Sequence, residues 1–100
     1  MVLILLERAP ASLKGELSRW LMELRSGVYL GTVSALVRDE LWEICQRKIR
    51  AGGCMLVHPT NNEQGFTIRT SGELSRDLVN LDGLLLTCRR SRARDEQAET

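Results

Sequence analysis

The sequence predicts an α+β fold in which two helices cover one antiparallel sheet. Short apolar runs recur along the chain, and glycine, proline or charged residues bound each of them. Between these runs lie two segments whose apolar residues recur at helical spacing. A chain of 100 residues is one domain, so these elements are expected to pack as two layers around one core.

The first strand is predicted over Val2 to Leu6, a continuous apolar run that ends at the charged pair Glu7-Arg8. Pro10 breaks the run, and Ser12 is the expected N-cap of the first helix. Gly27 is expected to end this helix. One apolar stripe follows from the spacing of its large side chains, and it is expected to face the core: Leu13, Leu17, Trp20, Leu21 and Leu24.

A short strand is expected at Val28 to Leu30, with Thr32-Val33 as a candidate for another. Ser34 is the expected N-cap of the second helix, which ends at Gly52-Gly53. The predicted inner face of this helix consists of Val37, Leu41, Ile44, Cys45 and Ile49.

Three further strands are predicted at Cys54 to His58, Phe66 to Thr70 and Leu84 to Cys88. A turn-rich loop separates the first two, and Asp82-Gly83 marks a turn before the last. Residues 91–100 have no side chain suited to a core, so we expect a folded domain over residues 1–90 and a disordered tail over 91–100.

The order of these elements fits a ferredoxin-like sandwich, with two helices on one face of an antiparallel sheet. The strands after the second helix have no required place in that unit. Because an uncovered edge strand promotes aggregation, we expect the last strand to pair with a second chain, or to cross onto it.

Composition narrows the classes of function. The formal net charge is +1, so nucleic-acid binding would need local clusters of Arg and Lys. The longest apolar run, Val2 to Leu6, is far shorter than the roughly 20 residues of a membrane helix, and it lacks signal-peptide features, so a cytoplasmic protein is expected. The three cysteines form no CxxC pair and are expected to be buried thiols, and a single histidine argues against a zinc site.

Glu7 is the candidate metal-binding or acid/base residue. It follows an apolar strand directly, and a twofold dimer could bring two copies together around one Mg²⁺, which often uses only one or two carboxylates. The alternative is a surface charge at a strand end, paired with Arg8. No second acidic residue stands at a recognisable spacing, so both interpretations stay open.

Basic residues are the candidates for contacts with a nucleic-acid backbone. Phosphate groups are bound by guanidinium and ammonium groups, and the amides at the start of the first helix could add donors. The alternative is that these side chains are only solvated. The candidate nucleic-acid-binding residues are Arg8, Lys14, Arg38 and Arg76, with Arg76 expected in a loop after the Phe66 strand.

Several short motifs occur in an order that resembles one known family. They are Arg25 to Ser34, Trp42-Glu43, Thr60-Asn61 with Gly65-Phe66, and Leu81 to Leu84. Together they resemble the CRISPR-associated protein two family, in its type I-E branch, which supplies the small subunit of the spacer-acquisition complex. The resemblance covers roughly Val2 to Cys88.

This resemblance implies a ferredoxin-like homodimer that assembles with the CRISPR integrase subunit and carries a DNA duplex across its surface. Lys14 and Arg76 match basic positions of the family, whereas Ser75 replaces the second member of a basic pair, and Arg8 stands where the branch often has a polar residue. The residues implied to bind the partner lie in the C-terminal strands: Leu81, Leu84, Leu85, Leu86 and Cys88.

Members outside this branch often have an aspartate where this chain has Glu7, and metal-dependent nuclease activity has been attributed to it. Glutamate is one methylene longer, and metal catalysis depends on fixed geometry. We therefore expect a non-catalytic scaffold of spacer acquisition. The alternatives are a Mg²⁺-dependent endonuclease that cuts RNA or DNA at the dimer cleft through Glu7, and a small regulatory dimer that binds a metabolite.

Overall fold

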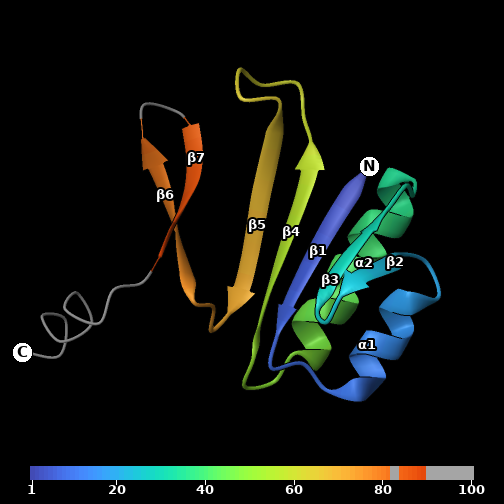
Figure 1. Cartoon of the computed structure of the whole chain (residues 1–100). Helices are drawn as coiled ribbons and strands as arrows, with labels where there is room; N and C mark the ends of the chain where they lie inside the picture. Colours follow the sequence, from blue (N-terminus) through green and yellow to red (C-terminus); the bar gives the residue numbers. More distant parts are fainter. Residues whose placement is uncertain (82–83, 90–100) are drawn as a thin grey trace, which may run out of the picture.

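The structure is a computed structural model that describes residues 1–81 and 84–89, with side chains described up to Ser75. Two helices and seven strands lie within these residues (Figure 1). In chain order they are β1 (Val2–Glu7), α1 (Ala11–Ser18), β2 (Met22–Arg25), β3 (Val28–Gly31), α2 (Ala35–Lys48), β4 (Gly53–Pro59), β5 (Phe66–Gly72), β6 (Arg76–Leu81) and β7 (Leu84–Arg89).

The main sheet has five strands in the order β2-β3-β1-β4-β5, and every neighbouring pair is antiparallel. The first four strands and two helices have the βαββαβ connectivity of a ferredoxin-like unit, with β1 between β3 and β4. The predicted α+β, ferredoxin-like fold is therefore confirmed. β5 extends the sheet beyond β4, as the outermost strand on that side.

The core lies between one face of the sheet and the two helices. Alternate residues of β1 are buried and half-buried, so one face of the strand points to the helices and the other does not. Ile4, Tyr29 and Leu56 are fully buried on the helix face. Leu17 of α1 and Leu41 of α2 belong to the same cluster.

The second helix begins and ends close to where the sequence predicts. The Ser34 hydroxyl accepts a hydrogen bond from the Val37 amide at 3.2 Å, which satisfies one of the free donors at the helix start. Arg47 and Lys48 lie in the last turn, where positive charge is favourable. This helix cap is a confirmed prediction.

The first helix is much shorter than predicted. It ends at Ser18, Pro10 rather than Ser12 occupies the N-cap, and residues 22–25 form the edge strand β2. Trp20 is 53% exposed, so its predicted place in the core is wrong, and Leu24 is exposed as well. Hydrogen bonding to β3 outweighs the helical spacing of these apolar residues, as tertiary pairing commonly does.

Gly27 forms the turn between β2 and β3 instead of ending a helix. Its φ of +83° suits glycine, and an added Cβ would meet the Leu6 carbonyl oxygen. The Gly27 carbonyl accepts a hydrogen bond from the Leu6 amide at 2.7 Å, so this turn packs against the end of β1.

Two other sequence predictions differ from the structure. Thr32-Val33 is part of the connection to α2 rather than a strand. Arg76 is the first residue of β6, a strand that the sequence analysis missed, rather than part of a loop. The expected turn at Asp82-Gly83 and the tail over 91–100 lie outside the described residues.

Strands β6 and β7 form a separate two-stranded sheet. Figure 1 shows this hairpin standing beside β5 and away from the helices. Neither α1 nor α2, the helices within the described residues, has the length and apolar character to span a bilayer.

Candidate nucleic-acid and partner-binding surfaces

The Glu7 carboxylate is engaged within the chain. Both of its oxygens lie 3.0 Å from the backbone nitrogen of Ser75, which donates its N–H to them. Glu7 is the last residue of β1, and Ser75 immediately precedes β6. The candidate metal ligand therefore binds the segment that leads into the C-terminal hairpin.

That segment, residues 73–75, is called the connection below, and each of its residues is held. The Glu73 amide donates to the Gly52 carbonyl at 3.0 Å, and the Glu73 carbonyl accepts from Nη2 of Arg8 at 3.0 Å. Leu74 is buried. With the bond from Ser75 to Glu7, the connection is tied to the end of β1 and to the start of β4.

Glycines make room for this crossing. Glu7, Gly53 and Gly72 are cross-strand neighbours in β1, β4 and β5, so side chains at these positions would share one face of the sheet. An added Cβ on Gly53 would collide with the Glu73 carbonyl and meet the Leu74 side chain. The connection thus lies over Gly53, on the face to which Glu7 points.

The electrostatics of Glu7 follow from these contacts. Partial burial opposes its ionisation, but the hydrogen bonds from Ser75 and the positive charge of Arg8 outweigh that effect and hold the pKa of Glu7 below its ordinary value. Glu7 is therefore a carboxylate at neutral pH. Hard divalent cations use such oxygen ligands, so Glu7 could supply one ligand of Mg²⁺, and a second Glu7 would have to come from another chain. Within the described residues, no group of three or more His, Cys, Asp or Glu side chains lies together.

Arg8 and Lys14 lie at the same end of the sheet as Glu7. Arg8 has a φ of +55° and binds the connection, whereas Nζ of Lys14 donates to Oγ of Ser26, in the turn between β2 and β3, at 3.4 Å. Arg76 follows the connection directly, and its side chain lies outside the described part. The structure therefore brings together the backbone positions of three of the four predicted basic residues.

Arg38 lies at the opposite end of the sheet, in the first turns of α2. Its Nε is 3.1 Å from Oδ1 of Asp39, and its Nη1 is 3.3 Å from Nδ1 of His58. Arg69, which the sequence analysis did not single out, reaches the same Asp39 oxygen at 3.4 Å. These four residues form a second charged cluster, separate from Arg8 and Lys14.

His58 is buried, with 5% of its surface exposed, and its Nε2 has no hydrogen-bond partner among the described atoms. Burial and the charges of Arg38 and Arg69 lower its pKa, and these effects outweigh the Pro59 carbonyl and Asp39, which favour protonation. His58 is therefore neutral at pH 7, and the sequence prediction that gave it no catalytic task stays a prediction.

The face of the sheet away from the helices is apolar across all five strands. The strand register aligns one residue from each strand, and this row is called the open-face row: Met22, Leu30, Leu3, Val57 and Ile68. Met22 is 62% exposed and the other four are half-buried. No helix among the described elements covers this face, and its row of apolar side chains is only partly buried by the described residues.

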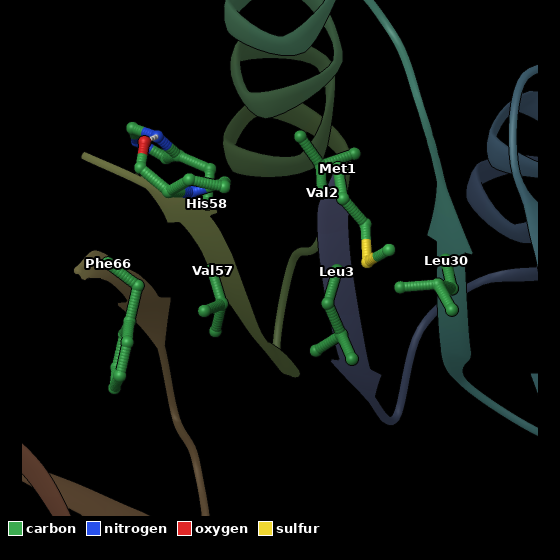
Figure 2. Close-up of a pocket in the computed structure, with 8 residues that line it drawn as sticks. Met1, Val2, Leu3, Leu30, Val57, His58 and Phe66 are labelled. Atoms are coloured by element: carbon green, nitrogen blue, oxygen red, sulfur yellow. Dashed lines mark hydrogen bonds between the residues drawn. The ribbon is translucent and has the colours of Figure 1, made fainter.

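A pocket of about 240 Å³ lies at the middle of this row, where Leu30, Leu3 and Val57 line it. Figure 2 shows the side chains of Leu3, Val57 and Phe66 on the side of the sheet away from α2, with Met1 and Leu30 beside them. The sequence carries a signal for this face. All residues of the Val2 to Leu6 run are apolar, whereas a strand with one solvated face would alternate.

The predicted partner-binding residues belong to the C-terminal hairpin. Leu81 ends β6, and Leu84, Leu85, Leu86 and Cys88 lie in β7. The hairpin is paired in register from Arg76↔Arg89 to Leu81↔Leu84. The predicted strand over Leu84 to Cys88 is therefore confirmed, and its binding role stays a prediction.

The other cysteines, Cys45 of α2 and Cys54 of β4, are buried and free. Hydrogen bonding between the two thiols and burial raise the pKa of Cys45. They are core residues, as the sequence predicts.

Comparison with known families supports a CRISPR-associated family for this chain. The family model described as CRISPR-associated protein (Cas_Cas2CT1978) matches residues 1–86, which include the whole five-stranded sheet, both helices and most of the hairpin. The chain therefore belongs to this CRISPR-associated family.

Proposed function

We propose that this chain is a non-catalytic scaffold of CRISPR spacer acquisition, of the type I-E branch, and that it works in the cytoplasm as a homodimer. Membership of the CRISPR-associated family supports a role in this defence system. In the proposed complex the dimer bridges two integrase dimers and holds a DNA duplex by its backbone. The fixed width of the dimer sets the length of DNA that is inserted.

The observation that carries the dimer is the uncovered apolar face of the sheet. The open-face row spans five strands, and an exposed surface of this kind is typical of a protein interface. The connection crosses Gly53 on this same face before β6 begins. The hairpin thus leaves the domain on the side where a second copy would pack.

The hairpin is the proposed attachment point for the integrase, and we propose that it also helps to join the two copies of the chain. Among the described strands, β6 and β7 pair with each other and not with the main sheet, so each has one edge that no other described strand covers. Such edges bind other strands. Leu81, Leu84, Leu85, Leu86 and Cys88 would supply the side-chain contacts.

The proposed contacts with DNA are to phosphates. Arg8, Lys14 and Arg76 are grouped at one end of the sheet, and Arg38 would make a separate contact at the other end. Phosphate contacts position a duplex without reading its sequence, which suits a protein that must accept any spacer.

The bond from Ser75 gives Glu7 a structural task that requires no metal, and this favours the scaffold over the Mg²⁺-dependent endonuclease. If Glu7 does hold Mg²⁺, the ion would supply polarisation of a phosphate oxygen or activation of water.

Co-purification with the integrase from the same locus tests the proposal. We expect the intact chain to form a stable complex that binds duplex DNA, and a variant that lacks residues 84–88 to lose the integrase. Normal co-purification of the truncated chain would contradict the proposed docking role of β7. An intact chain that binds neither integrase nor DNA would contradict the scaffold itself.

A further inference from the structure

The C-terminal hairpin joins the rest of the domain through three residues. β5 ends at Gly72 and β6 starts at Arg76, and the two sheets share no paired strands. The direction of the hairpin is therefore set by the conformation of the connection. The contacts that hold residues 73–75 in place therefore also orient β6 and β7.

The connection is held from two places: the end of β1, with the residue that follows it, and the residue before β4. Gly52, just before β4, accepts a hydrogen bond from the Glu73 amide through its carbonyl. Arg8, just after β1, fixes the Glu73 carbonyl. Glu7 fixes the Ser75 amide, the last backbone donor before β6, so it acts closest to the hairpin.

We propose that Glu7 is a positioning residue: its carboxylate clamps the Ser75 amide and thereby sets the direction in which the β6–β7 hairpin is presented to a second copy of the chain. The second copy rests on the proposed function, whereas the clamp rests on the geometry alone. Both carboxylate oxygens face one N–H, and a hydrogen bond to a charged acceptor is stronger than one to a neutral acceptor.

The Glu7 side chain reaches Ser75 where the neighbouring strand positions are glycines. Glu7 of β1 pairs with Gly53 of β4, and Gly53 pairs with Gly72 of β5. These two glycines add no side chain of their own to the face of the sheet beside Glu7. The glycines thus leave room for the contact between Glu7 and Ser75, which needs no metal.

Two substitutions separate the clamp from other roles of Glu7. Glu7→Ala removes the acceptor. Glu7→Gln removes the charge but keeps one carbonyl oxygen that can accept from Ser75, so it should restore part of the clamp. Glu43→Gln is the matched control, because Glu43 is an exposed residue of α2 whose ion pair with Arg47, at 4.0 Å, is itself exposed to solvent.

The experiment measures amide hydrogen exchange by NMR, with the Ser75 amide as the reporter and amides within β4 as the reference. In Glu7→Ala we expect Ser75 to exchange roughly 10- to 100-fold faster, as the loss of a hydrogen bond to a charged group implies. Glu7→Gln should show a smaller acceleration, and Glu43→Gln none. The amides of β4 should not change in any of them.

Sedimentation equilibrium on the same samples measures how tightly the dimer associates. Glu7→Ala should weaken the dimer more than Glu7→Gln does, because a loose connection presents the hairpin in many directions. An unchanged Ser75 rate in Glu7→Ala would overturn the clamp. If Glu7→Ala speeds exchange throughout β4, the comparison of Glu7→Gln with wild type decides, and an unchanged Ser75 rate there overturns the clamp equally.

The two proposals can fail independently. A wild-type chain that remains a monomer at every concentration would refute the homodimer, and with it the presentation of the hairpin to a second copy, while the exchange rates still decide whether Glu7 holds Ser75. A dimer with equal dissociation constants in wild type and Glu7→Ala would overturn the presentation role of the clamp.

Discussion

The carboxylate of Glu7 and the backbone amide of Ser75, 68 residues apart in the sequence, meet at 3.0 Å. The contact joins the end of the central strand to the segment that starts the C-terminal hairpin. An acidic residue at this place therefore has a mechanical task in the folded chain.

Glu7→Gln should leave spacer acquisition largely intact. The glutamine still offers an oxygen to Ser75, but the substitution removes the negative charge that makes a carboxylate a strong Mg²⁺ ligand. An acquisition assay in cells that express the integrase and the variant measures this directly, with Glu43→Gln as the control. Abolished acquisition, with complex assembly and DNA binding preserved, would instead support the endonuclease alternative.

Gly53→Ala should destabilise the domain by about 1–3 kcal/mol, the usual cost of overpacking a filled site. Its Cβ would press on the Glu73 carbonyl, which is backbone and cannot swing aside. The matched control is Gly15→Ala. Gly15 lies within α1 with no atom near its Cβ position, so alanine should stabilise the domain by about 0.5–1 kcal/mol. Urea unfolding measures both, and equal effects of the two substitutions would contradict the packing described for the connection.

Arg8→Ala and Lys14→Ala should each weaken duplex binding and reduce the salt dependence by about one unit of slope, as the loss of one phosphate contact implies. The loss should be similar for any duplex sequence. Binding titrations across a range of salt concentrations test this. Arg47→Ala, which removes an exposed charge from the last turn of α2, is the control and should leave the slope unchanged. A slope that changes equally in all three variants would count against a defined phosphate site.

The free energy of unfolding should decrease as the pH falls below about 6.5. The folded chain holds the pKa of His58 under its ordinary value of 6.5, so the unfolded chain binds a proton more readily, and acid favours unfolding. Glu7 and Asp39, whose pKa values are also lowered, lose their stabilising charge only below their ordinary values of 4.5 and 3.8. Denaturant unfolding between pH 5 and pH 7.5 therefore isolates His58, and a His58→Gln variant should have a flatter profile. An identical pH dependence in both proteins would contradict the burial assigned to His58.

Much of the fold could be predicted from local pattern. Three predictions are confirmed: the strand β1 from its apolar run, the serine cap of α2, and the strand that ends at Pro59. Each of these features is determined by residues that are close together in the sequence. β2 could not be predicted, since Leu21 and Leu24 continue the helical spacing of α1, and only the pairing of Met22 with Leu30 across the sheet overrides it. Trp20 was misplaced for the same reason.

Part of the candidate functional site could be predicted from the sequence. The position of Glu7 at the end of an apolar strand identifies it as a candidate. Its partner Ser75 could not be predicted, because Ser75 is distant in sequence and donates a backbone N–H, a group that almost every residue type has. Arg69 could not be connected with Arg38 before the position of β5 beside β4 was known, because the two contact the same Asp39 oxygen from different elements. The open-face row likewise needs the register of five strands.

The central claim, that two copies join through the open face of the sheet, is tested most directly by the mass of the chain in solution. Leu30→Lys places a charge in the open-face row, and Leu36→Lys makes the same change on α2 at a side chain that is already 70% exposed. Sedimentation equilibrium should give a dimer for the wild type and for Leu36→Lys, and a folded monomer for Leu30→Lys. A wild-type monomer, or a Leu30→Lys variant that dimerises as tightly as the wild type, would contradict the account.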